Sequence, residues 1–289
     1  MTKPLLACLF LTTVALSTVP SPAAKSRLSL SPADPQQGDA VFVRFTGEAS
    51  EPELRWQNER YPLYRDGSGW RGNLPVSADT PAGRHPVAVR YVEDGTPRFT
   101  QTTLQVRTRK FPVQYLKMAR STASLYNYPG VEKEDDAVSA AIRVRSDERL
   151  WSGDWRIPSR GRFSTEYGVR RFRNGRPVGR HRGLDIAAPT GTPIVAPAAG
   201  RVVLARTAKQ FKKYGGTVVL DHGQGLTTMY LHMSQVGVKD GQRVKKGHPI
   251  GKVGDTGVAT GPHLHWSAYL YGESLHPMFF TRLSEQGIS

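Results

Sequence analysis

Residues 226–233 and 263–270 alternate between apolar and polar side chains with the period of two that is typical of β-strands. In the second stretch the apolar face would carry Leu264, Trp266, Ala268 and Leu270, and the polar face His263, His265, Ser267 and Tyr269. In the first stretch Met229, Leu231 and Met233 would face one way, and Thr228, Tyr230 and His232 the other. The pattern therefore predicts strands with apolar backs whose polar faces present three histidines to a groove.

Short alternating runs also recur between residues 28 and 108, where turn-forming residues separate them. Their apolar members include Val41, Val43, Phe45, Val87, Val89, Tyr91, Leu104 and Val106. Several short strands at regular spacing favour a sandwich, so residues 25–108 are expected to form an all-β module. Its aromatic residues are expected in the core, with a sugar- or peptide-binding face as the alternative.

The rest of the chain is expected to hold a connector at 109–155 and a C-terminal domain at 156–289. Acidic residues from Glu132 precede an alanine-rich run, which favours a short helix with acids in its first turn. This connector would pack on one or both domains, where it could shield a groove. In the last domain, strands are expected near 200–204 and 217–220, with His222 in the turn after the second. The fold class is thus mainly β.

A basic loop at residues 172–180 turns at Asn174-Gly175, just ahead of His181. It is either a solvated hairpin tip or a groove wall that contacts an anionic substrate.

Residues 1–24 have a positive start, a short apolar run and small residues before a cut, as in a secretory signal. The run is too short for a membrane span, and no other stretch qualifies, so no transmembrane segment is expected in the mature chain. An uncleaved anchor is the alternative. Cys8 is the only cysteine, and Leu5-Leu6-Ala7-Cys8 is similar to a lipoprotein processing site placed too early for it. Lipidation there is a minor possibility.

The formal net charge is +16, and removal of Lys3 with the signal leaves +15. A basic exported protein is attracted to polyanions such as cell-wall polymers and other anionic envelope polymers. The chain has no nucleic-acid motif beside this charge, so nucleic acid is not expected as a partner. We expect an exported protein that is periplasmic, cell-wall associated or secreted.

Candidate metal ligands occur at two tight spacings: His181 with Asp185, and His263 with His265. Two imidazoles and one carboxylate suit zinc, and three protein ligands leave a fourth position open, as in catalytic sites. His181, Asp185 and one member of the close pair would supply these ligands. Neither spacing is specific alone, but their combination with His232 between them strengthens the prediction.

The window from about 163 to 277 resembles the lysostaphin-type, LytM-like zinc metalloendopeptidases, which cleave bacterial peptidoglycan. The resemblance is carried by 163–170, by His181-Arg182-Gly183-Leu184-Asp185, by 198–202, by Asp221-His222-Gly223, by Tyr230-Leu231-His232 and by Gly261-Pro262-His263-Leu264-His265. It implies one zinc ion on His181, Asp185 and His265, with His232 and His263 as the catalytic pair. It also implies a small-strand β-barrel or sheet domain of the duplicated hybrid motif type.

The sequence thus predicts a zinc-dependent endopeptidase acting on peptidoglycan crosslinks or stem peptides. Two alternatives are a non-catalytic activator of a cell-wall amidase and a wall-binding protein whose β module does the work.

Overall fold

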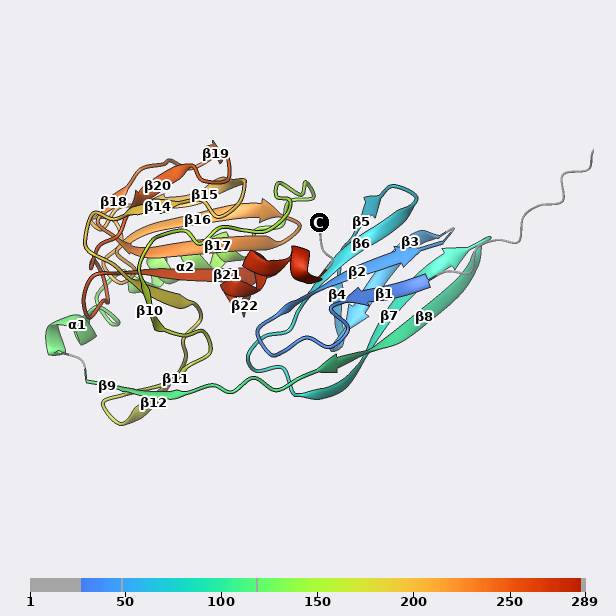
Figure 1. The fold of residues 1–289 in the computed structure, drawn as a ribbon, viewed down its shortest axis with the longest axis horizontal. Coiled ribbons are helices and arrows are strands. Elements are labelled where there is room, and N and C mark those ends of the chain that lie inside the picture. Colours follow the sequence, from blue (N-terminus) through green and yellow to red (C-terminus); the bar gives the residue numbers. More distant parts are fainter. Residues whose placement is uncertain (1–26, 48, 118, 287–289) are drawn as a thin grey trace, which may run out of the picture.

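The structure is a computed structural model that describes residues 27–47, 49–117 and 119–286 (Figure 1). The described chain is mainly β, with short helices, as predicted. None of its helices is long and apolar enough to cross a bilayer. The expected signal at 1–24, including Cys8, lies outside the described residues.

The N-terminal part is a sandwich of two four-stranded antiparallel sheets. One sheet has the order β1 (Arg27–Ser31), β2 (Ala40–Thr46), β6 (Gly69–Pro75) and β5 (Leu63–Asp66). The other has the order β4 (Glu59–Tyr61), β3 (Ser50–Trp56), β7 (Gly83–Glu93) and β8 (Thr96–Val106). The apolar members of the alternating runs, with Trp56, form their shared core. This agrees with the alternation, because every second residue of a strand points to the same face.

The C-terminal part is built on one large sheet of eight strands. Its order is β10 (Arg162–Thr165), β13 (Leu184–Ala187), β21 (His263–Leu270), β17 (Leu226–Met233), β16 (Gly216–Gly223), β15 (Gly200–Arg206) and β19 (Arg243–Val244), and β22 (Glu273–Leu275) pairs with β21. The strands expected near 200–204 and 217–220 are β15 and β16.

Strands β16 and β17 are buried at every residue, because both faces of the sheet are covered. On one face, Leu264, Trp266 and Tyr230 join the largest apolar cluster. On the other, Met229, Leu231 and Tyr269 pack with α2 (Val131–Ile142). The predicted polar faces are therefore interior over most of their length, and only their ends reach a pocket.

Two three-stranded sheets complete the C-terminal part. One contains β14 (Pro193–Val195), β20 (Pro249–Lys252) and β18 (Gln235–Val236). The other contains β12 (Arg176–Arg180), β11 (Arg170–Arg173) and β9 (Val113–Leu116), and is called the wall below. Two 3-10 helices, η1 (Pro277–Arg282) and η2 (Ser284–Gln286), follow β22.

The segment between sandwich and large sheet is only partly helical. The helix expected from Glu132 is α2, and a short α1 (Arg120–Ser124) precedes it. Strand β9 was not foreseen: it pairs in parallel with β11, so this segment contributes an edge to the wall.

The sandwich packs directly on the C-terminal part (Figure 1). The Phe42 ring of β2 lies 6.0 Å from that of Trp151 and 6.2 Å from that of Phe279. Tyr61 of β4 lies 5.5 Å from Tyr271. These aromatic contacts join the sandwich to the C-terminal part, and Tyr271 follows the end of β21 that lies opposite to His263 and His265.

Candidate metal centre

Strand pairing places two of the candidate ligands opposite each other. Asp185 of β13 is in register with His265 of β21, and residues directly opposite in an antiparallel pair share a face. His181 follows β12 and is fixed by backbone hydrogen bonds in both directions: its N–H donates to Val169, and its carbonyl accepts from Gly168. Three segments thus converge on one point.

The ligand atoms of His181, Asp185 and His265 form a tight triangle. His181 Nε2 lies 2.9 Å from Asp185 Oδ1 and 2.9 Å from His265 Nδ1, and His265 Nδ1 lies 2.8 Å from the same carboxylate oxygen. The edge of a zinc tetrahedron is about 3.3 Å for bonds of about 2.0–2.1 Å, so a small outward shift would seat the ion. These residues can therefore hold a metal ion.

The outer nitrogens of both ligand histidines are already engaged. His181 Nδ1 donates to the Glu166 carbonyl at 2.9 Å, and His265 Nε2 contacts Ser267 Oγ at 2.7 Å. With its proton on the outer nitrogen, each ring directs a lone pair to the triangle, where the carboxylate adds a third. Three electron-pair donors facing one point at this distance is the arrangement that a cation stabilises.

His232 and His263 lie beside the triangle. Their ring centroids are 4.7 Å apart, and the His232 centroid is 6.2 Å from that of His265. His263 Nε2 is 3.8 Å from Asp185 Oδ1. His232 Nδ1 donates to the Thr256 carbonyl and His263 Nδ1 to the Gly261 carbonyl, and Nε2 of neither ring makes a hydrogen bond within the described part of the chain. The five candidate residues therefore share one site.

Burial sets the charge of these groups. It lowers the pKa of His265 to about 4, and together with the neighbouring His263 and His265 it lowers the pKa of His232 to about 3. Burial alone would raise the pKa of Asp185, but hydrogen bonds with His181 and His265 hold it well below its usual range. Near neutral pH His265 is thus a neutral imidazole and Asp185 a carboxylate, the forms that bind metal.

His232 reaches the site by a route that the alternation did not predict. Tyr230, expected on the same face, is in the core on the opposite side of the sheet. His232 has a φ of +64°, in the left-handed region, and this breaks the period of two at the end of β17. The ring consequently turns to the His265 face. His222 was also misplaced: it is a fully buried residue of β16 that bonds Ala199 and Thr228, and it is outside the metal triangle.

No sequence motif marks Arg171 as a site residue, because it is one of many arginines in this part of the chain. Its Nη2 is 3.2 Å from Asp185 Oδ2, the carboxylate oxygen turned away from the triangle, and its Nε donates to Gln114 of β9 at 3.1 Å. It links the wall to the carboxylate.

The pocket that contains the site holds only about 110 Å³. One face of the wall lines it with Gln114, Leu116, Arg171, Arg173 and Val178, and Tyr126 adds to this side. The Arg173 guanidinium lies 3.9 Å from the centre of the Tyr126 ring. Residues of the segment before the C-terminal domain thus line the pocket, as expected if this segment shields the groove. The 172–180 hairpin also lines it and forms a groove wall.

Comparison with known proteins gives concordant matches. Residues 179–277 match the profile of Peptidase family M23. The chain is 38% identical over 123 residues to the peptidoglycan DD-endopeptidase ShyA of Vibrio cholerae, covering 42% of this chain and 28% of that protein. The chain covers less than a third of the length of the first curated relatives it matches.

Two solved structures add to this. A Pseudomonas aeruginosa structure described as a peptidase of family M23 matches 86% of this chain and 94% of its own, with a TM-score of 0.62 and 29% identity. The catalytic domain of lysostaphin from Staphylococcus simulans is 31% identical over 42% of this chain and 92% of its own, with a TM-score of 0.37. The first likeness includes the sandwich as well as the large sheet, since it spans most of the chain.

Proposed function

Because this chain belongs to peptidase family M23, we propose that it is a zinc-dependent endopeptidase that hydrolyses peptide crosslinks or stem peptides of bacterial peptidoglycan. The observation that carries the proposal is the triangle of His181 Nε2, Asp185 Oδ1 and His265 Nδ1, with two further imidazoles beside it. An activator without catalysis needs none of these groups, so their presence supports the hydrolase over that alternative.

His181, Asp185 and His265 hold one zinc ion in this proposal. Bound zinc supplies a Lewis acid that polarises the scissile carbonyl and lowers the pKa of a water molecule. Ser267 and the Glu166 carbonyl fix the tautomers of the ligand histidines, and Arg171 orients the carboxylate through its outer oxygen.

Proton transfer falls to His232 and His263. Each ring is anchored through Nδ1 and keeps Nε2 free for the reacting groups. One ring takes a proton from the attacking water and returns it to the leaving amine, while the other donates a hydrogen bond to the oxygen on which negative charge develops. The chain then acts in the cell envelope, which agrees with its expected export and its net charge of +16.

In this proposal the chain consists of four segments: a signal at 1–24, an all-β module at 25–108, a connector at 109–155 and the peptidase domain at 156–289. The connector pairs with β11 of the wall through β9 and packs on the large sheet through α2, which supports assigning it to the control of the site rather than to a free linker.

The test is mass spectrometry of fragments released from purified sacculi, combined with metal analysis. The wild-type chain should release peptide fragments, lose this activity on chelation and recover it with zinc. His265→Ala should release none and retain far less zinc. Full activity of the metal-free chain would overturn the proposal.

A further inference from the structure

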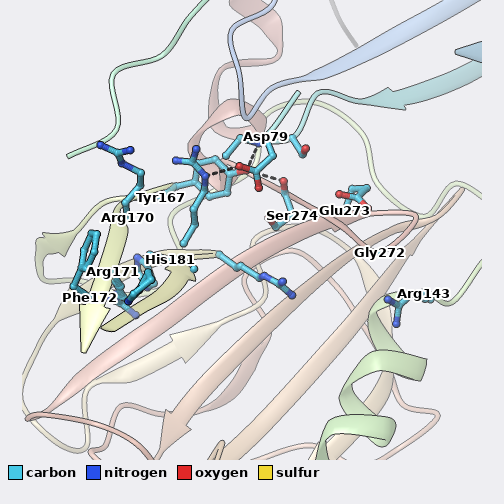
Figure 2. A pocket seen from close by; sticks show the side chains of 16 residues that line it. Asp79, Arg143, Tyr167, Arg170, Arg171, Phe172, His181, Gly272, Glu273 and Ser274 are labelled. Carbon is cyan, nitrogen blue, oxygen red and sulfur yellow. Dashed lines mark hydrogen bonds and ion pairs between the residues drawn. The ribbon is translucent and has the colours of Figure 1, made fainter. Parts of the chain in front are cut away.

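A basic cleft lies beside the metal centre, between the sandwich and the C-terminal part (Figure 2). Its lining differs from that of the small pocket of the triangle, and Arg171 lines both. The cleft holds about 540 Å³, within the range of about 300–1,000 Å³ common for ligand sites, which often lie at such junctions. Its floor is Tyr167, whose hydroxyl accepts from the Ala78 N–H and donates to the Ser274 carbonyl.

Positive charge dominates this cleft. Five arginines from three parts of the chain line it, against two acidic residues, which leaves a formal charge of +3: Arg143, Arg170, Arg171, Arg180 and Arg182, with Asp79 and Glu273. In Figure 2, Arg170 and Arg171 lie on one side of the cleft and Arg143 on the other. A narrow space lined by one sign of charge raises the local concentration of counter-charged ligands.

Not all of these arginines are neutralised. Arg180 pairs with Asp79 at 2.6 Å, and Arg171 with Asp185 at 3.2 Å. Among the described residues, the exposed side chains of Arg170 and Arg182 make no hydrogen bond or ion pair. Such groups can bind an anion without breaking any internal contact.

The cleft borders the metal centre. His181 lines it and is also a candidate ligand, and Arg182 is the next residue along the chain. The wall separates the two spaces: Val178 faces the metal pocket, whereas Pro177 and Gly179 face the cleft. Arg171 lines both spaces, so the cleft lies directly beside the pocket in which a peptide would be cut.

We propose that this cleft binds carboxylate groups of the substrate peptide through Arg170 and Arg182, and so selects acidic peptides for cleavage. The inference rests on the proposed peptidase function. Guanidinium groups bind carboxylates through paired hydrogen bonds, while Tyr167, Phe172 and Pro177 offer contact for the uncharged parts of a peptide. Glu273, exposed and without an ion pair in the described chain, disfavours a dense polyphosphate in the same space.

The test compares Arg170→Gln/Arg182→Gln with a matched control, Arg84→Gln/Arg90→Gln, which removes two exposed arginines from β7 of the sandwich. Probes are crosslinked peptides released from purified peptidoglycan, the same peptides with their carboxylates converted to carboxamides, and tripolyphosphate. Dissociation constants are measured by calorimetry in a His263→Ala background, which slows turnover, and KM and kcat in the otherwise wild-type chain.

We expect the cleft variant to bind the acidic peptide about tenfold more weakly for each arginine removed, with a matching rise in KM and a kcat within about twofold of wild type. The carboxamide peptide should bind the wild-type cleft as weakly as the acidic peptide binds the variant, and the variant should not distinguish the two peptides. The control should bind like wild type.

Equal binding of acidic and carboxamide peptides by the wild-type cleft would overturn the proposal, and this comparison requires no variant in the cleft. Tighter binding of tripolyphosphate with the same dependence on Arg170 and Arg182 would assign the cleft to phosphate polymers and would also overturn it. Carboxylate-dependent binding without hydrolysis would instead defeat the proposed peptidase activity and leave the cleft assignment standing. Hydrolysis of acidic and carboxamide peptides alike would defeat the cleft assignment and leave the proposed peptidase activity standing.

Discussion

The two sides of the metal pocket are built in opposite ways. The floor, formed by β13, β17 and β21, is buried along almost its whole length and packed on both faces. The wall is mostly exposed: Tyr115 is 74% exposed and Val178 42%, and its contacts to the pocket are a cation–π pair and an ion pair. None of the strand residues of the wall is buried, whereas each buried large apolar side chain of the floor contributes about 1.5–3 kcal/mol.

This difference assigns a separate task to each side: the floor holds most of the site residues in position, and the wall controls how a substrate reaches them. Four of the five site residues stand on the floor strands, where packing holds them, and the fifth, His181, follows β12 of the wall and is held by backbone hydrogen bonds. Groups that a substrate must pass stand on the wall, where little free energy opposes their movement. Changes to the floor should thus affect metal and rate strongly, and changes to the wall should affect access weakly.

The largest effect is expected from His263→Ala on the floor. Loss of a proton-transfer group should lower kcat by about 10²–10⁴-fold. Zinc content should stay near one ion per chain, because His263 is outside the triangle. Steady-state kinetics with metal analysis checks this, with His248→Ala as a histidine control outside the site. Loss of zinc from His263→Ala would contradict the division of roles.

Gly183→Ala should disturb the floor without removing any ligand. A methyl group at Gly183 would lie 2.7 Å from His265 Nε2 and 2.4 Å from Ser267 Oγ, so the ligand ring must shift. We expect zinc affinity to fall about 10–100-fold, as for loss of an outer partner of a metal ligand. Competition with a chromophoric chelator measures it. Gly261→Ala, where the added methyl meets nothing within 4 Å, is the matched control; equal affinities in both variants would refute the steric argument.

Packing around β16, the strand next to β17 of the floor, should make stability depend on pH through His222. Burial lowers its pKa to about 4, below the value of about 6.5 in an unfolded chain. The unfolded state therefore binds more protons between these values, and stability falls as pH drops from about 6.5 to 4, by about 3 kcal/mol from this residue. Urea unfolding of wild type and His222→Gln across this range checks it; parallel pH profiles would exclude His222 as the source.

The smallest effect is expected on the wall. Tyr126→Ala removes the ring that Arg173 covers and widens a pocket of about 110 Å³, too small for a peptide segment. We expect kcat/KM on a soluble peptide to rise by a few fold, with zinc affinity unchanged. Tyr115→Ala is the control, because that ring is outside the residues lining the pocket. A fall in kcat/KM for Tyr126→Ala would show that the ring assists the substrate instead of obstructing it.

The sequence predicted the floor better than the wall. Alternation in 263–270 identified the apolar back of β21 correctly. The motif spacing indicated His181, Asp185 and one member of the close histidine pair, and the family resemblance chose His265, which the structure places with the other two. Strand alternation was one reason to expect His232 at the site, and that reason is wrong. A backbone conformation with positive φ directs its ring instead. A pattern that assumes regular strands cannot predict on which face of the sheet such a side chain lies.

Elements of the wall depend on contacts distant in the chain. β9 has four residues, and its partner β11 begins more than fifty residues later, so no local pattern marks their pairing. Arg171 and Gln114 became meaningful only when Asp185 was seen to lie beside them. Where the domain boundaries fall remains a prediction.

Strand β9 also has a mechanical consequence. Only six residues separate the end of β8, the last strand of the sandwich, from the start of β9, and in extended form they span about 20 Å. Attachment to a stretched polymer is one force that would pull the sandwich away from the large sheet. Because the tether is so short, such a force acts first on β9, the edge strand of the wall beside the catalytic pocket.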